Sequence, residues 1–267
     1  MELKNNSGNW DKLKTDIPYI VRLSSDKKIV ESILDVIKSV EYDYRKGDII
    51  TVILPKLSLK KKWDAYLHNT TRARIEKQLL THKHIMVATM PLHLVYENAK
   101  DKHLMIPEEE LPILDISKDH YRNRVIVPLD NINQPSVRAL RFAKTISDNV
   151  TAFSVAIDEA AETKLRTRWN KLHTDIPYVI KYSAYRKVVE PLLDFIKSAE
   201  YDYRKNDIIT VILPQFAVRK LWHRLLHNRT RIYIERQLLK HKHIVVAVMP
   251  FQLKDDKTAL GEDEYMD

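Results

Sequence analysis

Basic and polar side chains recur at two matching places where a predicted strand gives way to a helix. The later junction runs from Pro214 to Arg231, and the earlier one from Pro55 to Arg72. Guanidinium, imidazole and hydroxyl groups near a helix start can bind a phosphate. Alternatively, the apolar residues of each helix pack and the arginines lie in solvent. The candidate ligand-binding residues are Gln215, Arg219, His227, Asn228, Arg229, Thr230 and Arg231, with His68, Asn69, Thr71 and Arg72 in the earlier junction.

Two aspartates, Asp130 and Asp158, each follow a predicted strand. Their carboxylates can accept hydrogen bonds from a ribose or a base at the carboxyl end of a parallel sheet. Aspartate is equally typical of turns and helix N-caps. Both residues are therefore candidate ligand contacts, with capping as the alternative.

Other motifs favour structural interpretations. The pairs His82/His84 and His241/His243 precede a predicted strand, where histidine complements the dipole of a helix end, so we expect no metal site. The segment 201–205 and its earlier match 42–46 mix tyrosine with basic residues, but they lie where a helix should end. Packing explains them better than base stacking, so we expect no nucleic-acid partner.

Catalysis has no support in the sequence. No nucleophile stands beside a base in a recognisable motif. The chain has three glycines, so no glycine-rich phosphate loop can be written. We expect no enzyme, no catalytic residue and no cofactor.

A long internal repeat organises the chain. Residues 10–94 match residues 169–253 without a gap, and 52 of the 85 paired positions are identical. This period is much longer than the roughly 20–50 residues of solenoid repeats. It indicates a duplicated domain or part of one.

The second half predicts a complete α/β domain at 123–254. Apolar, β-branched runs predict strands at 124–129, 151–157, 176–182, 207–213 and 244–249. Helical spacing between them predicts helices at 133–148, 160–169, 188–199 and 221–241. This alternation predicts a doubly wound parallel five-stranded sheet.

The first half predicts only part of that domain, at residues 1–94. It holds matches to the last three strands, at 17–23, 48–54 and 85–90. Such a three-stranded α/β copy exposes its edges and buries little, so we expect it to dock on the second copy or on another chain. Residues 95–122 are predicted to be a linker, and 255–267 an acidic, disordered tail.

The composition restricts the partners. A formal net charge of +9 favours anionic partners, although interspersed signs also suit a solvated surface. The chain has no cysteine and no apolar run approaching the roughly 20 residues of a membrane span. We therefore expect a cytoplasmic location.

Several segments, in order, resemble a known family. They are 124–130, 139–143, 150–155, 209–215, 222–228 and 244–253. Together they resemble the C-terminal domain of bacterial permeases of the amino acid–polyamine–organocation superfamily, including potassium importers, which has a universal-stress-protein-like fold. The resemblance implies a regulatory, non-enzymatic module at the inner face of the membrane.

The resemblance also implies partners. Tails of some related potassium importers dimerise and bind cyclic di-AMP, so we expect a cyclic dinucleotide or another anionic nucleotide, a membrane transporter, and homo-oligomers. The glycine motif of ATP-binding universal stress proteins is absent after the strand at 207–213. An alternative is a structural remnant or assembly module without its own ligand.

Overall fold

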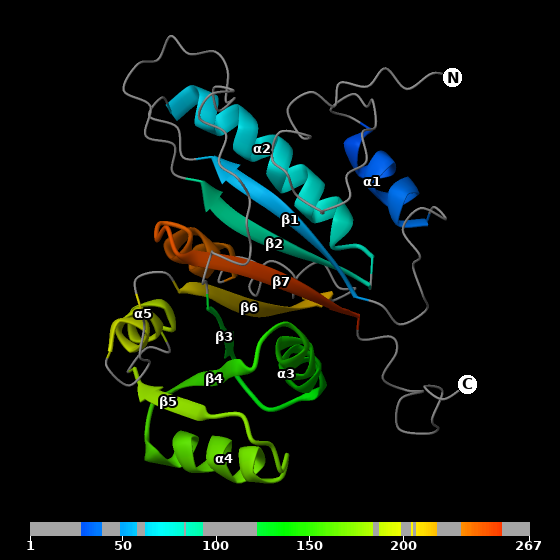
Figure 1. Ribbon diagram of the computed structural model, residues 1–267. Helices are drawn as coiled ribbons and strands as arrows, with labels where there is room; N and C mark the ends of the chain where they lie inside the picture. The colour runs from blue at the N-terminus through cyan, green and yellow to red at the C-terminus, as the bar shows by residue number, and fades with distance from the viewer. Residues whose placement is uncertain are drawn as a thin grey trace, which may run out of the picture.

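One sheet runs through the whole described structure (Figure 1). The computed structural model describes residues 28–38, 49–57, 62–82, 84–92, 122–183, 187–198, 204, 207–217 and 231–252. The predicted strand at 17–23, the acidic tail, and the predicted linker apart from Arg122 lie outside these residues. The strands are β1 (Ile50–Leu57), β2 (Ile85–Leu92), β3 (Asn123–Pro128), β4 (Asn149–Ala156), β5 (Tyr178–Tyr182), β6 (Ile208–Ala217) and β7 (Ile244–Gln252).

Helices alternate with the strands as the sequence predicts. They are α1 (Ile29–Lys38), α2 (Lys62–Leu79), α3 (Gln134–Ile146), α4 (Glu159–Asn170) and α5 (Val189–Lys197), followed by a helical segment at 231–238. The Asn133 side chain caps α3 by accepting from the Ser136 N–H at 3.1 Å, and Pro135 occupies the first turn. These features fix where the helix begins.

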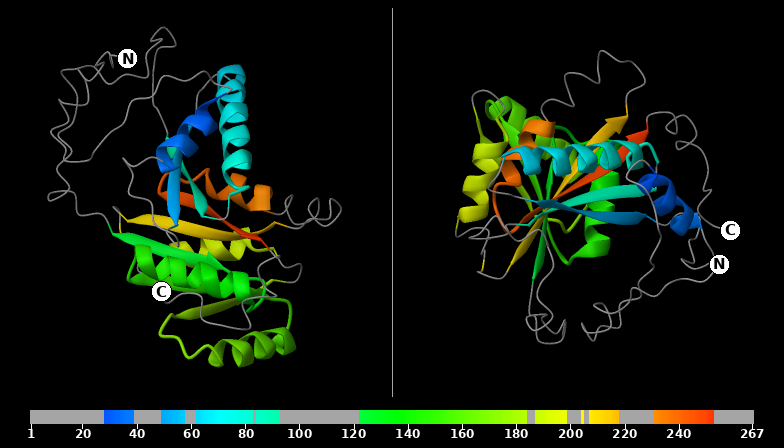
Figure 2. Two further views of the ribbon diagram at one scale, coloured as in Figure 1. Left: turned by 90° about the vertical axis from the view of Figure 1, so that its right-hand side faces the viewer. Right: turned by 90° about the horizontal axis from the view of Figure 1, so that it is seen from above.

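The second copy is the doubly wound sheet that the sequence predicts. Its strands lie in the order β7-β6-β3-β4-β5, and every neighbouring pair is parallel. The strand β5 begins at Tyr178 rather than at 176, and the preceding residue is Pro177, which has no N–H to donate. Figure 2 shows the twist of the sheet and the helices on its two faces.

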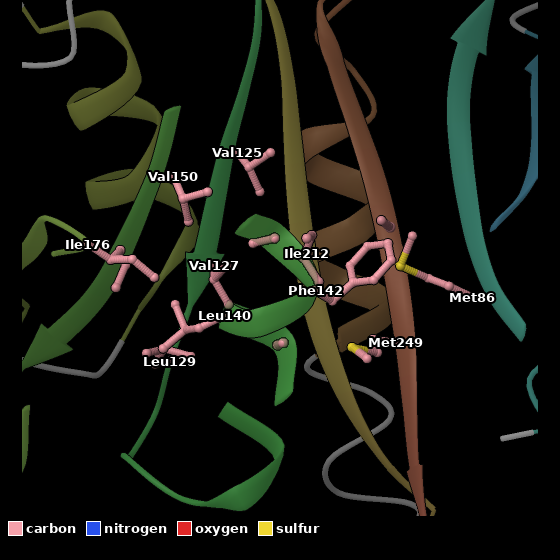
Figure 3. Close-up of a cluster of buried hydrophobic side chains, with 14 of the residues drawn as sticks. Met86, Val125, Val127, Leu129, Leu140, Phe142, Val150, Ile176, Ile212 and Met249 are labelled. Carbon is pink, nitrogen blue, oxygen red and sulfur yellow. The ribbon is translucent and has the colours of Figure 1, made fainter. Parts of the chain in front are cut away.

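Apolar side chains fill both faces of this sheet. On one face, α3 covers β3, β6 and β7; Leu140 and Phe142 lie over Val127, Ile212 and Met249 (Figure 3). On the opposite face, α5 and the 231–238 helix cover a second cluster that includes Ile126 and Val211. Burial on both faces explains why these strands are almost continuously apolar.

The first copy docks on the second by extending its sheet. Its strands β1 and β2 are parallel to each other, with α1 and α2 packed on one face. The strand β2 then pairs antiparallel with β7, and this is the one antiparallel pair among the described strands. Docking on the second copy is thus confirmed as one of the two arrangements expected from the sequence.

The register of this pair shows a local two-fold axis. Ala88 lies opposite Ala247, and these residues occupy the same position of the repeat. On either side, Val87 pairs with Val248 and Thr89 with Val246, which exchanges equivalent positions between the strands. An antiparallel pair centred on equivalent residues relates the two copies by an approximate half-turn, as in an isologous dimer interface.

An ion pair between the partly exposed Arg122 and the buried Asp207 holds the start of β3 against the start of β6. The Arg122 guanidinium donates Nε to Asp207 Oδ1 and Nη2 to Oδ2, both at 2.7 Å. The Arg204 N–H also donates to Asp207 Oδ2, at 3.0 Å. Asp207 is 2% exposed, and these hydrogen bonds, that of Arg122 above all, hold its pKa below the usual value.

We predict that Asp207→Asn lowers the free energy of unfolding by about 2 kcal/mol near neutral pH, because it leaves the guanidinium without its bidentate acceptor. The folded-state pKa of Asp207 is depressed, so its stabilisation is present above the unfolded pKa and is lost as pH falls through the folded pKa. Urea denaturation near pH 7 and near pH 3 checks this. An equal difference between wild type and variant at both pH values would contradict it.

Candidate functional site

Four charged side chains meet where the two copies join. They are Arg72 and Glu76 on α2 and their repeat equivalents, Arg231 and Glu235, on the 231–238 helix. Within a copy, Arg72 contacts Glu76 at 2.9 Å and Arg231 contacts Glu235 at 3.4 Å. Between copies, Arg72 contacts Glu235 at 3.5 Å and Arg231 contacts Glu76 at 3.0 Å. We call these four residues the charge ring.

The charge ring has the same local two-fold symmetry as the strand pair. Each contact has its equivalent in the other copy, and the four contacts alternate between arginine and glutamate. The i, i+4 spacing places each arginine beside the glutamate of its own helix. The ring therefore joins the helices above the β2–β7 junction.

One hydrogen bond breaks the symmetry. The Arg72 Nη1 also donates to the Thr89 hydroxyl at 2.9 Å, whereas the equivalent position in β7 is Val248. Thr89 is 2% exposed, so its hydroxyl needs an internal partner. The hydrogen bond to Thr89 thus holds Arg72 more firmly than Arg231.

Burial and compensation set the electrostatics of the ring. The glutamate side chains are 6% and 7% exposed, and the arginine side chains 14% and 16%. Burial raises the pKa of Glu235, the nearby Glu76 carboxylate raises it further, and both arginines oppose this. Burial also lowers the pKa of Lys56, and the positive charge of Arg72 adds to that effect. Two positive charges thus face two negative charges.

The structure brings together two of the residues predicted from the sequence to bind a ligand. Arg72 and Arg231 lie in the ring, and Thr71 is half-buried beside Arg72 on α2. Both guanidinium groups contact carboxylates, so an anion at this point would compete with Glu76 and Glu235. Sequence reasoning missed these glutamates; their signal was the Arg-x-x-x-Glu spacing in both copies.

The structure describes the side chains of two further predicted ligand residues, Asp130 and Asp158. Asp130 is exposed after β3, and Asp158 caps α4 by accepting from the Ala161 N–H at 2.7 Å, so the capping interpretation fits Asp158. Gln215 lies in β6, and His68 and Asn69 lie in α2, but the structure describes only their backbones. Arg219, His227, Asn228, Arg229 and Thr230 lie outside the described residues. A ligand role for these residues stays a prediction.

Hydroxyl groups near the carboxyl ends of β3 and β4 are already engaged. The Tyr178 hydroxyl donates to Ser154 Oγ at 2.8 Å, and Ser154 donates to the Leu129 carbonyl at 2.7 Å. The Tyr178 ring stacks on Trp169 with centroids 4.3 Å apart. Burial raises the pKa of Tyr178, so this phenol stays neutral. The arrangement packs this end of the sheet.

The described ranges lack two kinds of feature. No group of three or more histidine and carboxylate side chains that could hold a metal ion occurs there. Within those ranges, no helix has the length and hydropathy to cross a membrane.

Comparison with known families identifies both copies. A protein-family model described as the KimA potassium transporter C-terminal domain matches residues 2–92 and 120–251. The chain belongs to this family. The two matches correspond to the two copies of the repeat, and the longer match is the one that includes β3, α3, β4 and α4.

The chain is also similar in sequence to a potassium transporter. The chain is 30% identical to the potassium transporter KimA of Bacillus subtilis (strain 168) over 167 residues. The aligned region is 62% of this chain and 28% of the relative. The similarity to KimA thus spans somewhat more than a quarter of that transporter's length.

We predict that Glu76→Gln lowers the free energy of unfolding by about 3 kcal/mol, because it leaves two buried guanidinium groups with one carboxylate. Glu235→Gln should cost less, since its contacts are longer and burial already disfavours its charged form. Chemical denaturation of both variants measures this order.

The matched control is Glu190→Gln, because Glu190 pairs with Lys187 at 3.8 Å and both side chains are more than half exposed. This change should stay within about 0.5 kcal/mol of the wild type. Equal costs for Glu76→Gln and Glu190→Gln would show that the charge ring does not stabilise the junction between the copies.

Proposed function

We propose that this chain is a non-enzymatic regulatory module of a KimA-type potassium transporter, acting on the cytoplasmic side of the membrane. One observation carries the proposal: two copies of a transporter C-terminal domain lie in one chain and associate about a local two-fold axis. Such an axis is how two tails of a dimeric transporter would associate. One polypeptide here supplies both halves.

The similarity to KimA supports the proposed association of this chain with a transporter. KimA of Bacillus subtilis is a potassium transporter by name, and the similarity covers 28% of it. The family is the C-terminal domain of that transporter. A chain that contains two such domains acts on uptake by contacting a transporter or by binding the signal that a transporter tail would bind.

The ligand we propose is an anionic cyclic dinucleotide of the cyclic di-AMP type. Such a molecule is two-fold symmetric and carries two phosphodiester charges. The two basic junctions contain equivalent residues, including Lys60 and Arg219, and the repeat places one junction in each copy. Two junctions that are equivalent in the repeat suit a ligand with two equivalent phosphates. The net charge of +9 favours the approach of such an anion.

Calorimetric titration of the full chain tests the sensing function. We predict that cyclic di-AMP binds with one molecule per chain and a Kd of about micromolar order, and that ATP binds much more weakly. Arg219→Gln should weaken cyclic di-AMP binding roughly ten-fold or more, because a charge-assisted contact is lost.

The matched control is Arg166→Gln, which removes an exposed arginine of α4 that pairs with Glu162 at 2.6 Å. It should leave the affinity unchanged. An absence of heat with both nucleotides at high protein concentration would refute sensing. An equal loss of cyclic di-AMP affinity in Arg219→Gln and Arg166→Gln would refute a ligand site at the strand-to-helix junction that contains Arg219.

A second candidate function is an assembly module without a ligand. The buried charge ring and the β2–β7 ladder hold the two copies together through protein contacts alone. Co-purification of the chain with a KimA-type transporter, unchanged by cyclic di-AMP, would favour this function over nucleotide sensing.

A further inference from the structure

The outer edge of β1 and the adjoining sheet face are much more exposed than their equivalents in the second copy. Ile53 is 63% exposed, whereas its repeat equivalent Ile212 is 0% exposed. Met90 is 37% exposed, whereas its equivalent Met249 is 4% exposed. The same sequence motif therefore lies in two environments, and the difference identifies an uncovered surface.

The second copy shows what covers this surface there. β6 pairs with β3 on its far side, and α3 packs over Ile212 and Met249 (Figure 3). The repeat begins at Trp10, whose equivalent Trp169 lies in α4, after β3 and α3. Among the described residues, no strand and helix take the corresponding place beside β1. Among the described strands, β1 pairs with β2 alone.

The backbone of β1 has hydrogen-bonding groups directed at this edge. The Ile50 N–H donates toward β2, to the His84 carbonyl at 2.8 Å. Alternation along a strand then directs the N–H and C=O groups of Thr51 and Ile53 to the opposite side. In β6, the Ile208 N–H donates to the Arg122 carbonyl just before β3, which shows the same alternation.

We propose that this edge binds a second copy of the chain, with β1 of each copy pairing antiparallel about a two-fold axis at Ile53. The symmetry of the pairing favours a second copy as the partner. The edge strands of the described sheet are β1 and β5, and a two-fold pair at β1 closes the β1 edge of both chains at once. Exchange of the β3–α3 unit between chains would only move the open edge from one copy to the other. The antiparallel β2–β7 pair shows that equivalent strands of this repeat associate in this way.

The proposed register satisfies the backbone and avoids like charges. Each Ile53 exchanges both backbone hydrogen bonds with its counterpart, and each Thr51 N–H donates to the carbonyl of Pro55 in the other copy. Lys56 lies opposite Ile50, so no lysine faces a lysine. Pro55 has no N–H, which limits the ladder to the middle of the strand. The exposed isoleucines become neighbours on one face.

The proposed dimer is weak and depends on concentration, because one strand pair buries less than a standard protein interface. Sedimentation velocity over a wide concentration range should show reversible dimerisation of the full chain. Ile53→Lys should shift it to monomer by placing two charges together at the axis. Ile157→Lys, which alters another exposed isoleucine at 42% exposure, should not.

A cross-link tests the register. The chain has no cysteine, so Ile53→Cys introduces a single thiol. In the proposed pair the two Cα atoms lie about 5.5 Å apart, within the disulfide range, so mild oxidation should give a covalent dimer. Ile157→Cys should remain monomeric under the same conditions.

Two results would overturn the proposal. One is a wild-type chain that is monomeric at every concentration, and the other is a dimer in which Ile53→Cys cross-links no better than Ile157→Cys. Because Ile53 is mostly exposed, neither substitution should prevent folding. The test uses no nucleotide or transporter, so its result is independent of the proposed function.

Discussion

The antiparallel pairing of β2 with β7 is the contact on which the arrangement of the two copies depends. It joins two parallel sheets into one, and it places α2 beside the 231–238 helix so that the charge ring can form. Val87 and Val248 pair across it and lie in the same buried apolar cluster. The ladder supplies the backbone bonds, and apolar burial supplies the main driving force.

The duplication is unequal, and this inequality has physical consequences. The second copy has its own β3 and α3, which bury Ile212 almost completely. Among the described residues the first copy has no such strand and helix, so it depends on the second copy at β2, and β1 is an edge strand of the described sheet. A small sheet with few strands buries too little apolar surface to be stable alone. Docking at β2 compensates for part of this deficit.

Much of the fold could be predicted from the sequence because its signals are local. Apolar runs predicted β3, β6 and β7 within a few residues, and Asn133 with Pro135 predicted the start of α3. The repeat also predicted that the first copy must dock. The antiparallel register could not be predicted, because local patterning is the same whichever way two edge strands meet.

The candidate site was predicted less well than the fold. Arg72 and Arg231 were identified as charged residues at equivalent places, but their neutralisation by Glu76 and Glu235 depends on a contact between helices about 160 residues apart in sequence. The i, i+4 spacing showed only the pairing within each helix. Tertiary contacts between the copies decide whether such an arginine is free to bind an anion.

A pair of engineered cysteines tests the two-fold junction most directly, since the chain has no cysteine of its own. In the antiparallel register Val87 lies opposite Val248, whereas a parallel, in-phase register would place it opposite its repeat equivalent Val246. The structure therefore predicts that Val87→Cys with Val248→Cys forms an intramolecular disulfide, and that Val87→Cys with Val246→Cys does not. Cross-linking of the second pair in preference to the first would contradict the local two-fold arrangement.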